Sequence, residues 1–512
     1  MYIEEAYYFW RMASDLMLNQ DFDILHLSEE RNEIWLEKNV KSKAYVVRIT
    51  QQTFDWSNQL KRDQDTLIEN LKRFKRQLVG REVEVHNVYI SEFPPVDDWS
   101  DRKQPLHLND RKKTTIYHHY ITEQRTEHIN DIYKQLGLTE PSFVVPSELE
   151  MEQTIYELKR SMKRRHKRNQ QKMQQIFSFG KPRLTYLLIF INLAVFALLE
   201  YQGGSTNTLT LIQYGAKYNP AIMDGEWWRI LSSMFLHIGF FHIALNMLAL
   251  YYLGSPVERM YGSVRFAFIY FISGIIGGIT SFALTPSVAA GASGAIYGLF
   301  GALLFFGVVH KKLFFQTMGP NLLWVIALNI AFSFSIPQVD IGAHLGGLVG
   351  GFLASSIVHF PKKQSLPMQT GAAIFVLVVG VGMSWYGITN EDNHYDPRLQ
   401  AQVAQEYAKK GQYDKVIQLV DQTFRHIEGS ADLYFFRAIG YYNQGEVEKG
   451  IDDLHEAISI KPSFGLAHYN LSIFYQQKQN SEKALEHARK AVQNNPEDER
   501  FQELLQSLEK SG

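Results

Sequence analysis

The middle of the chain, roughly residues 184–388, is almost free of charged side chains, whereas the regions before and after it are rich in them. This contrast limits the fold more than any other feature, because a segment of this composition cannot form a water-exposed surface. We therefore expect the middle region to lie in a lipid bilayer. Over the whole chain, 52 Lys and Arg balance 53 Asp and Glu, and the net charge of −1 argues against nucleic acid as a partner.

Seven apolar segments divide the middle region. Their approximate bounds are 184–199, 238–253, 266–284, 289–309, 322–334, 341–358 and 372–387. Several are shorter than the roughly 20 residues that span a bilayer comfortably, although flanking residues extend them. The predicted fold class is a polytopic α-helical membrane protein, with about seven spans over residues 179–390. We expect a soluble α/β domain over residues 1–178 and an all-α repeat domain over residues 391–512.

Basic residues predict how the segments are oriented. A basic run at 159–168 precedes the first segment, and further basic residues lie at Arg259, Arg265, 310–312 and 362–363. The loops between the third and fourth and between the fifth and sixth segments contain no Lys or Arg. Since positive charge is retained in the cytoplasm, we expect a multi-pass protein of the cell membrane with a cytoplasmic N-terminus and, after an odd number of spans, an extracytoplasmic C-terminus. The acidic start predicts no cleavable signal peptide.

The N-terminal region combines alternating and amphipathic stretches. Alternating runs predict strands at 33–38, 44–50 and 82–90, and amphipathic stretches predict helices at 56–78 and 121–136. This pattern is typical of a soluble mixed α/β domain. Its place before the membrane region suggests a regulatory or substrate-recruiting role.

Some residues of this domain are of the types that bind hard divalent cations: Asp97, Asp98, Asp101, His118 and His119. Scattered aspartates and a histidine pair are more often solvated surface residues, so we predict no metal site and keep cation binding only as an alternative. The chain contains no cysteine, which excludes disulfides, thiol nucleophiles and Cys-ligated metal centres.

The C-terminal region repeats itself with a period of 34 residues, as shown by GQYDK at 411–415 and GEVEK at 445–449. Tyrosines, small residues and prolines recur with the same spacing: Tyr407, Tyr441 and Tyr475; Ala404, Ala438 and Ser472; Pro462 and Pro496. A 34-residue helix-turn-helix period is that of the tetratricopeptide repeat, and about three repeats fit the region. Such repeats usually form a concave surface for a protein partner. Another array of helical hairpins is the alternative.

Four polar residues inside the apolar segments are candidates for function, because polar groups in a membrane are costly. His242 and Asn246 share one face of the second segment. Ser293 lies in GASG at the start of the fourth segment, and His344 lies in GAHLGG at the start of the sixth. These three segments run in the same direction through the bilayer, so all four residues are predicted to lie at a similar depth, near the outer face.

A serine within hydrogen-bond reach of a histidine is the minimum for nucleophilic acyl transfer, because the imidazole takes the hydroxyl proton and returns it to the leaving amine. No acidic third residue is visible in the segments, so we predict a dyad of Ser293 and His344. His242, Asn246 and the Ser293 backbone N–H are donors for a developing oxyanion. Each residue alone is more often a packing residue in a membrane helix, but four at one depth favour a site.

These features resemble the rhomboid family of intramembrane serine proteases, in the Bacillus-type form that carries C-terminal tetratricopeptide repeats. The matching residues are Trp228-Arg229, the series His237, His242 and Asn246, Glu258-Arg259 with Tyr261-Gly262, GASG at 291–294 with Tyr297, and AHLGG at 343–347. As an ordered set they are specific, whereas GxSG alone is weak. The resemblance implies a core of six helices with an additional seventh span.

The resemblance also implies a role for each matching residue. Ser293 is the nucleophile and His344 is the general base and acid, while His242 and Asn246 assist the oxyanion. Tyr297 packs beside the catalytic histidine and His237 orders the first loop. Gly291 and Gly347 support the site, and the architectural residues are Trp228, Arg229, Glu258 and Arg259.

The sequence therefore predicts an intramembrane serine endopeptidase that cleaves membrane proteins in or near the outer end of their transmembrane helices. Its expected partners are transmembrane substrates, the lipid bilayer and a protein that binds the repeats, with no nucleic acid. The dyad needs no metal or organic cofactor. The alternative function is a non-enzymatic membrane scaffold or a transporter. A transporter is expected to contain paired broken helices or inverted repeats, and the sequence indicates neither.

Overall fold

The computed structural model describes residues 2–74, 78, 80–110, 112–141, 143, 145–336, 339–361 and 366–511. The basic pair Lys362-Lys363, used above to predict orientation, lies outside the described residues. The chain forms two compact units, which we describe separately. The first comprises residues 1–178 and 306–323, and the second comprises residues 179–305 and 324–512.

Among the described residues of the first unit, six strands form one mixed sheet in the order β1-β2-β3-β4-β6-β5. The strands are β1 (Asp23–Ser28), β2 (Glu33–Val40), β3 (Lys43–Gln51), β4 (Glu82–Ile90), β5 (Leu106–Leu108) and β6 (Thr114–Ile121). β1, β2 and β3 are antiparallel, β3, β4 and β6 are parallel, and β5 pairs antiparallel with β6. Parallel strands need a crossover connection, and α2 (Ser57–Phe74) provides the one between β3 and β4.

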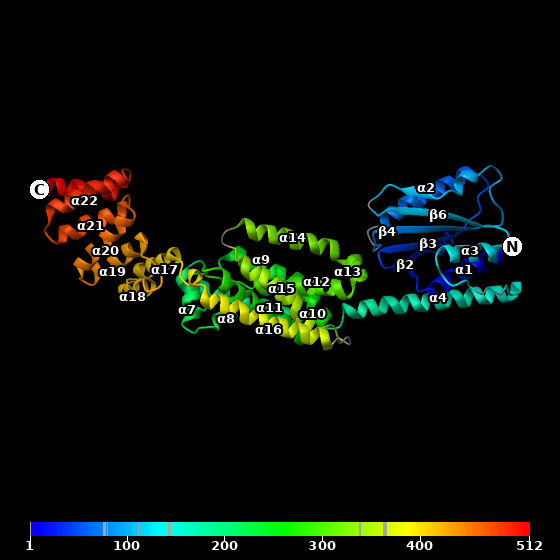
Figure 1. Ribbon diagram of the computed structural model, residues 1–512, viewed down its shortest axis with the longest axis horizontal. Helices are drawn as coiled ribbons and strands as arrows, with labels where there is room; N and C mark the ends of the chain where they lie inside the picture. Colours follow the sequence, from blue (N-terminus) through cyan, green and yellow to red (C-terminus); the bar gives the residue numbers. More distant parts are fainter. Residues whose placement is uncertain are drawn as a thin grey trace. The chain divides into compact units, whose positions relative to one another are not determined.

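Helices cover both faces of this sheet (Figure 1). α2 lies on one face, and α1 (Tyr2–Leu18), α3 (Arg125–Gln135) and α4 (Glu148–Ile176) lie on the other. Successive strand residues point to opposite faces, so Ile34 and Leu36 of β2 pack toward α1, whereas Trp35 packs toward α2. The central strands therefore contribute to two separate apolar cores.

The predicted strands at 33–38, 44–50 and 82–90 are confirmed as β2, β3 and β4. The helix predicted at 56–78 is α2, which ends at Phe74. The helix predicted at 121–136 begins only at Arg125, because Ile121 still belongs to β6. The sequence does not predict β6, since its residues, TTIYHHYI, lack a regular apolar alternation.

A helix occupies each of the predicted apolar segments. These helices are α5 (Arg183–Tyr201), the continuous run of α9 (Phe240–Ala249), η3 (Leu250–Gly254) and α10 (Ser255–Tyr261), then α11 (Ser263–Leu284), α12 (Ser293–Val309), α14 (Gly319–Ser335), α15 (Ile341–Val358) and α16 (Leu366–Thr389).

Among the described residues, five of these helical segments are long and apolar enough to cross a bilayer. The bent pair of α13 (Lys311–Thr317) and α14 makes a sixth candidate. The remaining segment, α12, is apolar but has only 17 residues. The protein is therefore a multi-pass membrane protein with five to six clear spans, and the total of seven stays a prediction.

Glycines allow α12 and α15 to pack at backbone distance. A Cβ atom added at Gly347 would lie 2.0 Å from the Gly294 carbonyl oxygen, and one added at Gly351 would lie 2.0 Å from the Gly298 carbonyl oxygen. Real Cβ atoms do not approach a carbonyl so closely, so only glycine fits at these two positions. This contact holds the first turns of the two helices next to each other.

The C-terminal region is entirely helical. Its described residues form three helical hairpins and a final helix: α17 (Pro397–Lys409) with α18 (Tyr413–Thr423), α19 (Ala431–Asn443) with α20 (Val447–Ile460), α21 (Gly465–Gln477) with α22 (Ser481–Asn494), and α23 (Glu499–Ser511). Ala404, Ala438 and Ser472, at equivalent positions of successive hairpins, have no exposed surface. The predicted small residues therefore lie where the paired helices approach closely.

The first hairpin packs against the connection between α5 and α9. This connection contains α6 (Thr208–Gln213), α7 (Asn219–Met223) and α8 (Arg229–Ser232). Val403 shares an apolar cluster with Leu209 and Tyr218 of the connection. The Tyr218 hydroxyl also donates a hydrogen bond to the side chain of Gln400 at 2.6 Å. The repeats are thus joined to the membrane region by packing as well as by the chain.

We predict that Gly351→Ala destabilises the membrane region by at least about 2 kcal/mol, because the new methyl group would overlap the backbone of α12. The matched control is Gly380→Ala on α16, where an added Cβ meets nothing within 4 Å. The control is expected to change stability by less than about 0.5 kcal/mol. Thermal unfolding of the full chain in detergent checks the difference, and equal stability of the two variants would contradict the close packing of α12 and α15.

Candidate active site

Ser293 and His344 lie in the first turns of two adjacent helices, α12 and α15. Asp340 caps α15, because its carboxylate accepts a hydrogen bond from the Ala343 backbone N–H at 2.9 Å. The same carboxylate accepts a short hydrogen bond from the Ser281 hydroxyl on α11. With the start of α15 held in this way, His344 Nε2 lies 2.9 Å from the Ser293 Oγ.

The imidazole of His344 is also contacted on its other sides. The Tyr297 ring stacks on it, with ring centroids 4.1 Å apart and planes 14° from parallel. His344 Nδ1 lies 2.8 Å from the hydroxyl of Ser333, on α14. The Tyr297 hydroxyl lies 3.0 Å from the same Ser333 oxygen. Both ring nitrogens and one ring face of His344 are therefore in contact with named partners.

His242 and Asn246 come from α9, and among the described residues neither makes a hydrogen bond to Ser293. A Cβ atom added at Gly291 would lie 3.1 Å from His242 Nε2 and 3.6 Å from Ser293 Oγ, so glycine leaves room for the imidazole beside the serine. His242 Nδ1 accepts from the Ile238 backbone N–H at 3.3 Å. Asn246 donates from its side-chain amide to the His242 carbonyl oxygen at 2.9 Å, which leaves its second N–H for another acceptor.

The turn that leads into Ser293 is held by the segment before α9. His237 is fully buried, and its Nε2 accepts a hydrogen bond from the Ala292 backbone N–H at 3.3 Å. The Gly291 backbone N–H donates to the Ser233 carbonyl oxygen at 2.9 Å. The turn is thus tied to the chain at two successive residues, and His237 joins the first loop directly to the residue before the serine.

A buried lysine holds the residues before this turn. Lys217 is 1% exposed, and its backbone pairs antiparallel with Ala289. Its Nζ donates to the carbonyl oxygens of Thr285 and Ser287 at 2.6 and 2.9 Å. Buried carbonyls outside regular secondary structure need such donors. Lys217 therefore fixes the path of the chain from α11 to α12.

Two of the residues expected to be architectural connect one helix to another. Glu258 accepts hydrogen bonds from the backbone N–H groups of Leu184 and Thr185 at 2.9 and 2.8 Å, so it caps the N-terminus of α5. Arg229 donates to the Ile212 carbonyl oxygen at 2.6 Å. These contacts hold α5 against α10 and α6 against α8.

The residues considered for a divalent cation do not converge. Asp97 accepts hydrogen bonds from the backbone N–H and the hydroxyl of Ser57, both at 2.6 Å. His119 Nε2 lies 3.0 Å from His86 Nδ1. In the part of the chain that the structure describes, no group of three or more His, Cys, Asp or Glu side chains is arranged to hold a metal ion. The geometry therefore gives the cation alternative no support.

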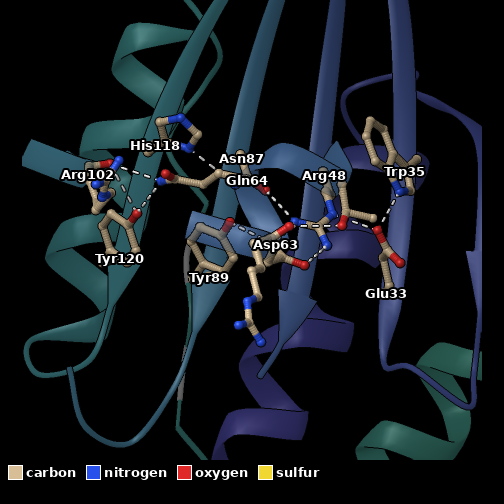
Figure 2. Close-up of polar contacts among 12 residues, drawn as sticks. Glu33, Trp35, Arg48, Asp63, Gln64, Asn87, Tyr89, Arg102, His118 and Tyr120 are labelled. Atoms are coloured by element: carbon tan, nitrogen blue, oxygen red, sulfur yellow. Dashed lines mark hydrogen bonds and ion pairs between the residues drawn. The ribbon is translucent and has the colours of Figure 1, made fainter. Parts of the chain in front are cut away.

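His118 belongs to a buried polar cluster between the sheet and α2 (Figure 2). At its centre, the Arg48 guanidinium donates to both carboxylate oxygens of Asp63, at 2.6 and 2.9 Å, and to Glu33 at 2.6 Å. Asn87 lies between Arg48 and His118, at 3.0 and 3.2 Å. Burial lowers the pKa of His118 to about 4, so this imidazole is neutral at pH 7. The cluster joins four strands to α2 through hydrogen bonds and ion pairs.

The sequence does not predict the contacts of Ser333, Asp340 and Lys217. Ser333 carries no distinguishing signal, because serine is a common packing residue in membrane helices. Asp340 does carry a sequence signal, since an acidic residue directly before an apolar helix is a typical N-cap. Lys217 also carries a signal. It is a basic residue in a loop predicted to lie outside, where few basic residues are expected.

Comparison with known proteins identifies the families that the membrane region and the repeats resemble. The Rhomboid domain family matches residues 224–360, and a tetratricopeptide repeat family matches residues 466–498. The chain is 39% identical over 149 residues to the putative rhomboid protease YdcA of Bacillus subtilis, a match that covers 29% of this chain and 75% of that protein. It is 36% identical over 155 residues to RHOMBOID-like protein 5 of Arabidopsis thaliana, covering 29% of this chain and 50% of the relative.

One similarity extends over nearly the whole chain. The rhomboid protease GluP of Bacillus subtilis is 34% identical to this chain over 478 residues, and the match covers 92% of each protein. It includes the N-terminal domain and the repeats as well as the membrane helices. The chain therefore belongs to the rhomboid family of intramembrane serine proteases, in a form that carries tetratricopeptide repeats after its membrane region.

Proposed function

We propose that this chain is an intramembrane serine endopeptidase in which Ser293 is the nucleophile and His344 is the general base. The observation that carries the proposal is the 2.9 Å contact between Ser293 Oγ and His344 Nε2. A serine hydroxyl is a weak nucleophile at neutral pH, and a base at this distance activates it by taking its proton. The substrates are membrane proteins, cleaved in or near the outer end of a transmembrane helix.

In the first step, Ser293 Oγ bonds to the scissile carbonyl carbon while the hydroxyl proton moves to His344 Nε2. The carbonyl electron pair moves onto its oxygen and forms a tetrahedral oxyanion. When this intermediate collapses, the C–N bond breaks and the Nε2 proton goes to the leaving amine. Water then attacks the acyl-serine in the same way, which releases the carboxylate and restores the serine proton.

Three donors are available to the oxyanion: the Ser293 backbone N–H, His242 Nε2–H and the second amide N–H of Asn246. His242 Nδ1 accepts from Ile238, so the ring proton of a neutral His242 lies on Nε2, which faces Gly291. Asn246 keeps one N–H on the carbonyl oxygen of His242, and this contact limits the rotation of its side chain. Both side chains are therefore set to stabilise negative charge beside the serine.

The substrate class follows from the place of the dyad within the membrane helices. The backbone of a helix hides its carbonyl carbons, so a transmembrane substrate must partly unwind before Ser293 can attack. Helices with glycine, alanine or other small residues near the outer boundary are the expected substrates.

The proposed orientation places the N-terminal domain in the cytoplasm and the repeats outside. Lys312, a basic residue expected on the cytoplasmic side, forms ion pairs with Asp23 and Glu37 of the N-terminal domain, at 2.7 and 2.8 Å. Tyr218, in a loop expected outside, bonds to Gln400 of the first repeat. The repeats are then placed to bind a substrate ectodomain, and the N-terminal domain to recruit or sense a cytoplasmic factor.

We predict that Ser293→Ala and His344→Ala each abolish cleavage of a model single-span substrate, because each removes one half of the proton transfer. Ser293→Ala is also expected to lose covalent labelling by a fluorophosphonate. Expression and membrane insertion should match the wild-type protein. Cleavage by a sequence-verified Ser293→Ala protein would show that another residue is the nucleophile.

We predict that His242→Ala or Asn246→Ala lowers turnover by about 10²–10³-fold without abolishing it, as expected for the loss of a principal oxyanion donor. The matched control is Asn329→Ala, since Asn329 makes the same type of bond within its helix, to the Val325 carbonyl oxygen, from an exposed position. Steady-state kinetics with one substrate checks the three variants. Unchanged turnover in both site variants and in their double variant would reject the oxyanion role.

We predict that protease added to intact spheroplasts digests the repeats and spares the N-terminal domain, because positive loops are held in the cytoplasm. Immunoblotting with a tag at each end follows the two regions separately. After lysis, both regions should become accessible. Protection of the repeats in intact spheroplasts would contradict either the odd number of spans or the orientation.

A further inference from the structure

Ser333 contacts the nitrogen of His344 that faces away from Ser293. It lies on α14, where most side chains are exposed, yet Ser333 itself is only 3% exposed. His344 Nδ1 lies 2.8 Å from the Ser333 Oγ. The same oxygen lies 2.8 Å from the Asn329 carbonyl oxygen and 3.0 Å from the Tyr297 hydroxyl. One hydroxyl thus has three polar neighbours.

The hydrogen bonds around Ser333 determine which nitrogen of His344 carries its proton. A carbonyl oxygen only accepts, so the Ser333 hydroxyl must donate its single proton if it bonds to Asn329. Its lone pairs then accept from His344 Nδ1–H and from the Tyr297 hydroxyl. A neutral imidazole with its proton on Nδ1 has a free lone pair on Nε2. That lone pair accepts the Ser293 hydroxyl proton, so every donor in the chain of contacts has an acceptor.

The opposite tautomer satisfies fewer groups. Suppose instead that the Ser333 hydroxyl donates its hydrogen bond to His344 Nδ1. The proton of the neutral imidazole would then lie on Nε2 and would point at the Ser293 oxygen. The Ser293 hydroxyl proton would then have no acceptor within the described residues, and the side-chain bond to Asn329 would be lost. Such an imidazole could not act as a base toward Ser293. The contacts therefore favour the tautomer that the reaction requires.

We propose that Ser333 is a positioning residue, which sets the tautomer and the orientation of His344 so that Nε2 faces Ser293 as a base. This proposal rests on the proposed function of the dyad. Ser333 takes no proton during the reaction. When Ser293 transfers its proton to Nε2, the imidazole becomes positively charged and its Nδ1–H stays bonded to the Ser333 oxygen. A hydrogen bond to a charged donor is stronger than one to a neutral donor, so the contact tightens as charge develops.

The alternative is that Ser333 only packs within the membrane, as serines in helices often do. Ser335 is the matched control for this alternative. It lies two residues further along α14, is exposed, and donates to the Ala331 carbonyl oxygen at 2.9 Å, the same bond within the helix that Ser333 makes. It differs from Ser333 in having no contact with His344 among the described residues.

The test uses the full-length protein in liposomes with a model single-span substrate. Ser333→Ala is expected to lower kcat about tenfold, the equivalent of one ordinary hydrogen bond, and to leave KM within about twofold. Labelling of Ser293 by a fluorophosphonate should slow by a similar factor, because this reaction does not depend on substrate binding. Ser335→Ala should behave as the wild type. A wild-type kcat in Ser333→Ala would overturn the positioning role.

A second pair of variants separates the hydroxyl from the shape of the side chain. Ser333→Thr and Ser333→Val have nearly the same volume, but only threonine keeps the oxygen. Threonine is expected to retain most of the activity, and valine to lose about as much as alanine. Equal rates for the two variants would overturn the proposal, even if the alanine variant failed to fold. If the wild-type protein neither cleaves nor labels, the proposed function itself fails, which is a different result.

Discussion

The backbone contact between α12 and α15 is the constraint on which the rest of the membrane region depends. In lipid, apolar side chains gain little by packing against one another, so helices associate where small residues let their backbones meet. Gly347 and Gly351 provide this approach, and a Cβ atom at either position would lie 2.0 Å from a carbonyl oxygen of α12. Because α12 begins at Ser293 and His344 lies in the first turn of α15, the same contact sets the distance between these two side chains.

The close packing alone does not aim the two side chains. Asp340 holds the first turn of α15, and Lys217 and His237 hold the residues that lead into α12. Each of these side chains makes a hydrogen bond to a backbone group at a helix end or in a connection, and leaving such a group without a partner is costly in apolar surroundings. The polar residues around Ser293 therefore stabilise the loops that present it.

The membrane region and the repeats could be predicted from the sequence because both follow from periodic patterns. Absence of charge indicates the spans, and the 34-residue period places Ala404, Ala438 and Ser472 at the helix contacts. The ordered motifs indicate Ser293 and His344 as well. What the sequence does not indicate are contacts between residues distant in the chain, such as Ser333 with His344. The mixed sheet was predicted only in part, since β6 carries polar side chains that bond to neighbouring strands instead of an apolar alternation.

The segment from Lys217 to Asn219 connects the repeats to the turn before Ser293. Lys217 holds the residues between α11 and α12, and Tyr218 bonds to Gln400 of the first repeat. Asn219 donates to the Thr285 carbonyl oxygen at 3.1 Å and to the carbonyl oxygen of Asn393, in the segment between α16 and α17, at 2.5 Å. Consecutive residues thus bind the first repeat and the connection that leads into α12 at Ser293. Because these contacts are short and buried, the first repeat is part of the packing that holds the serine turn in place.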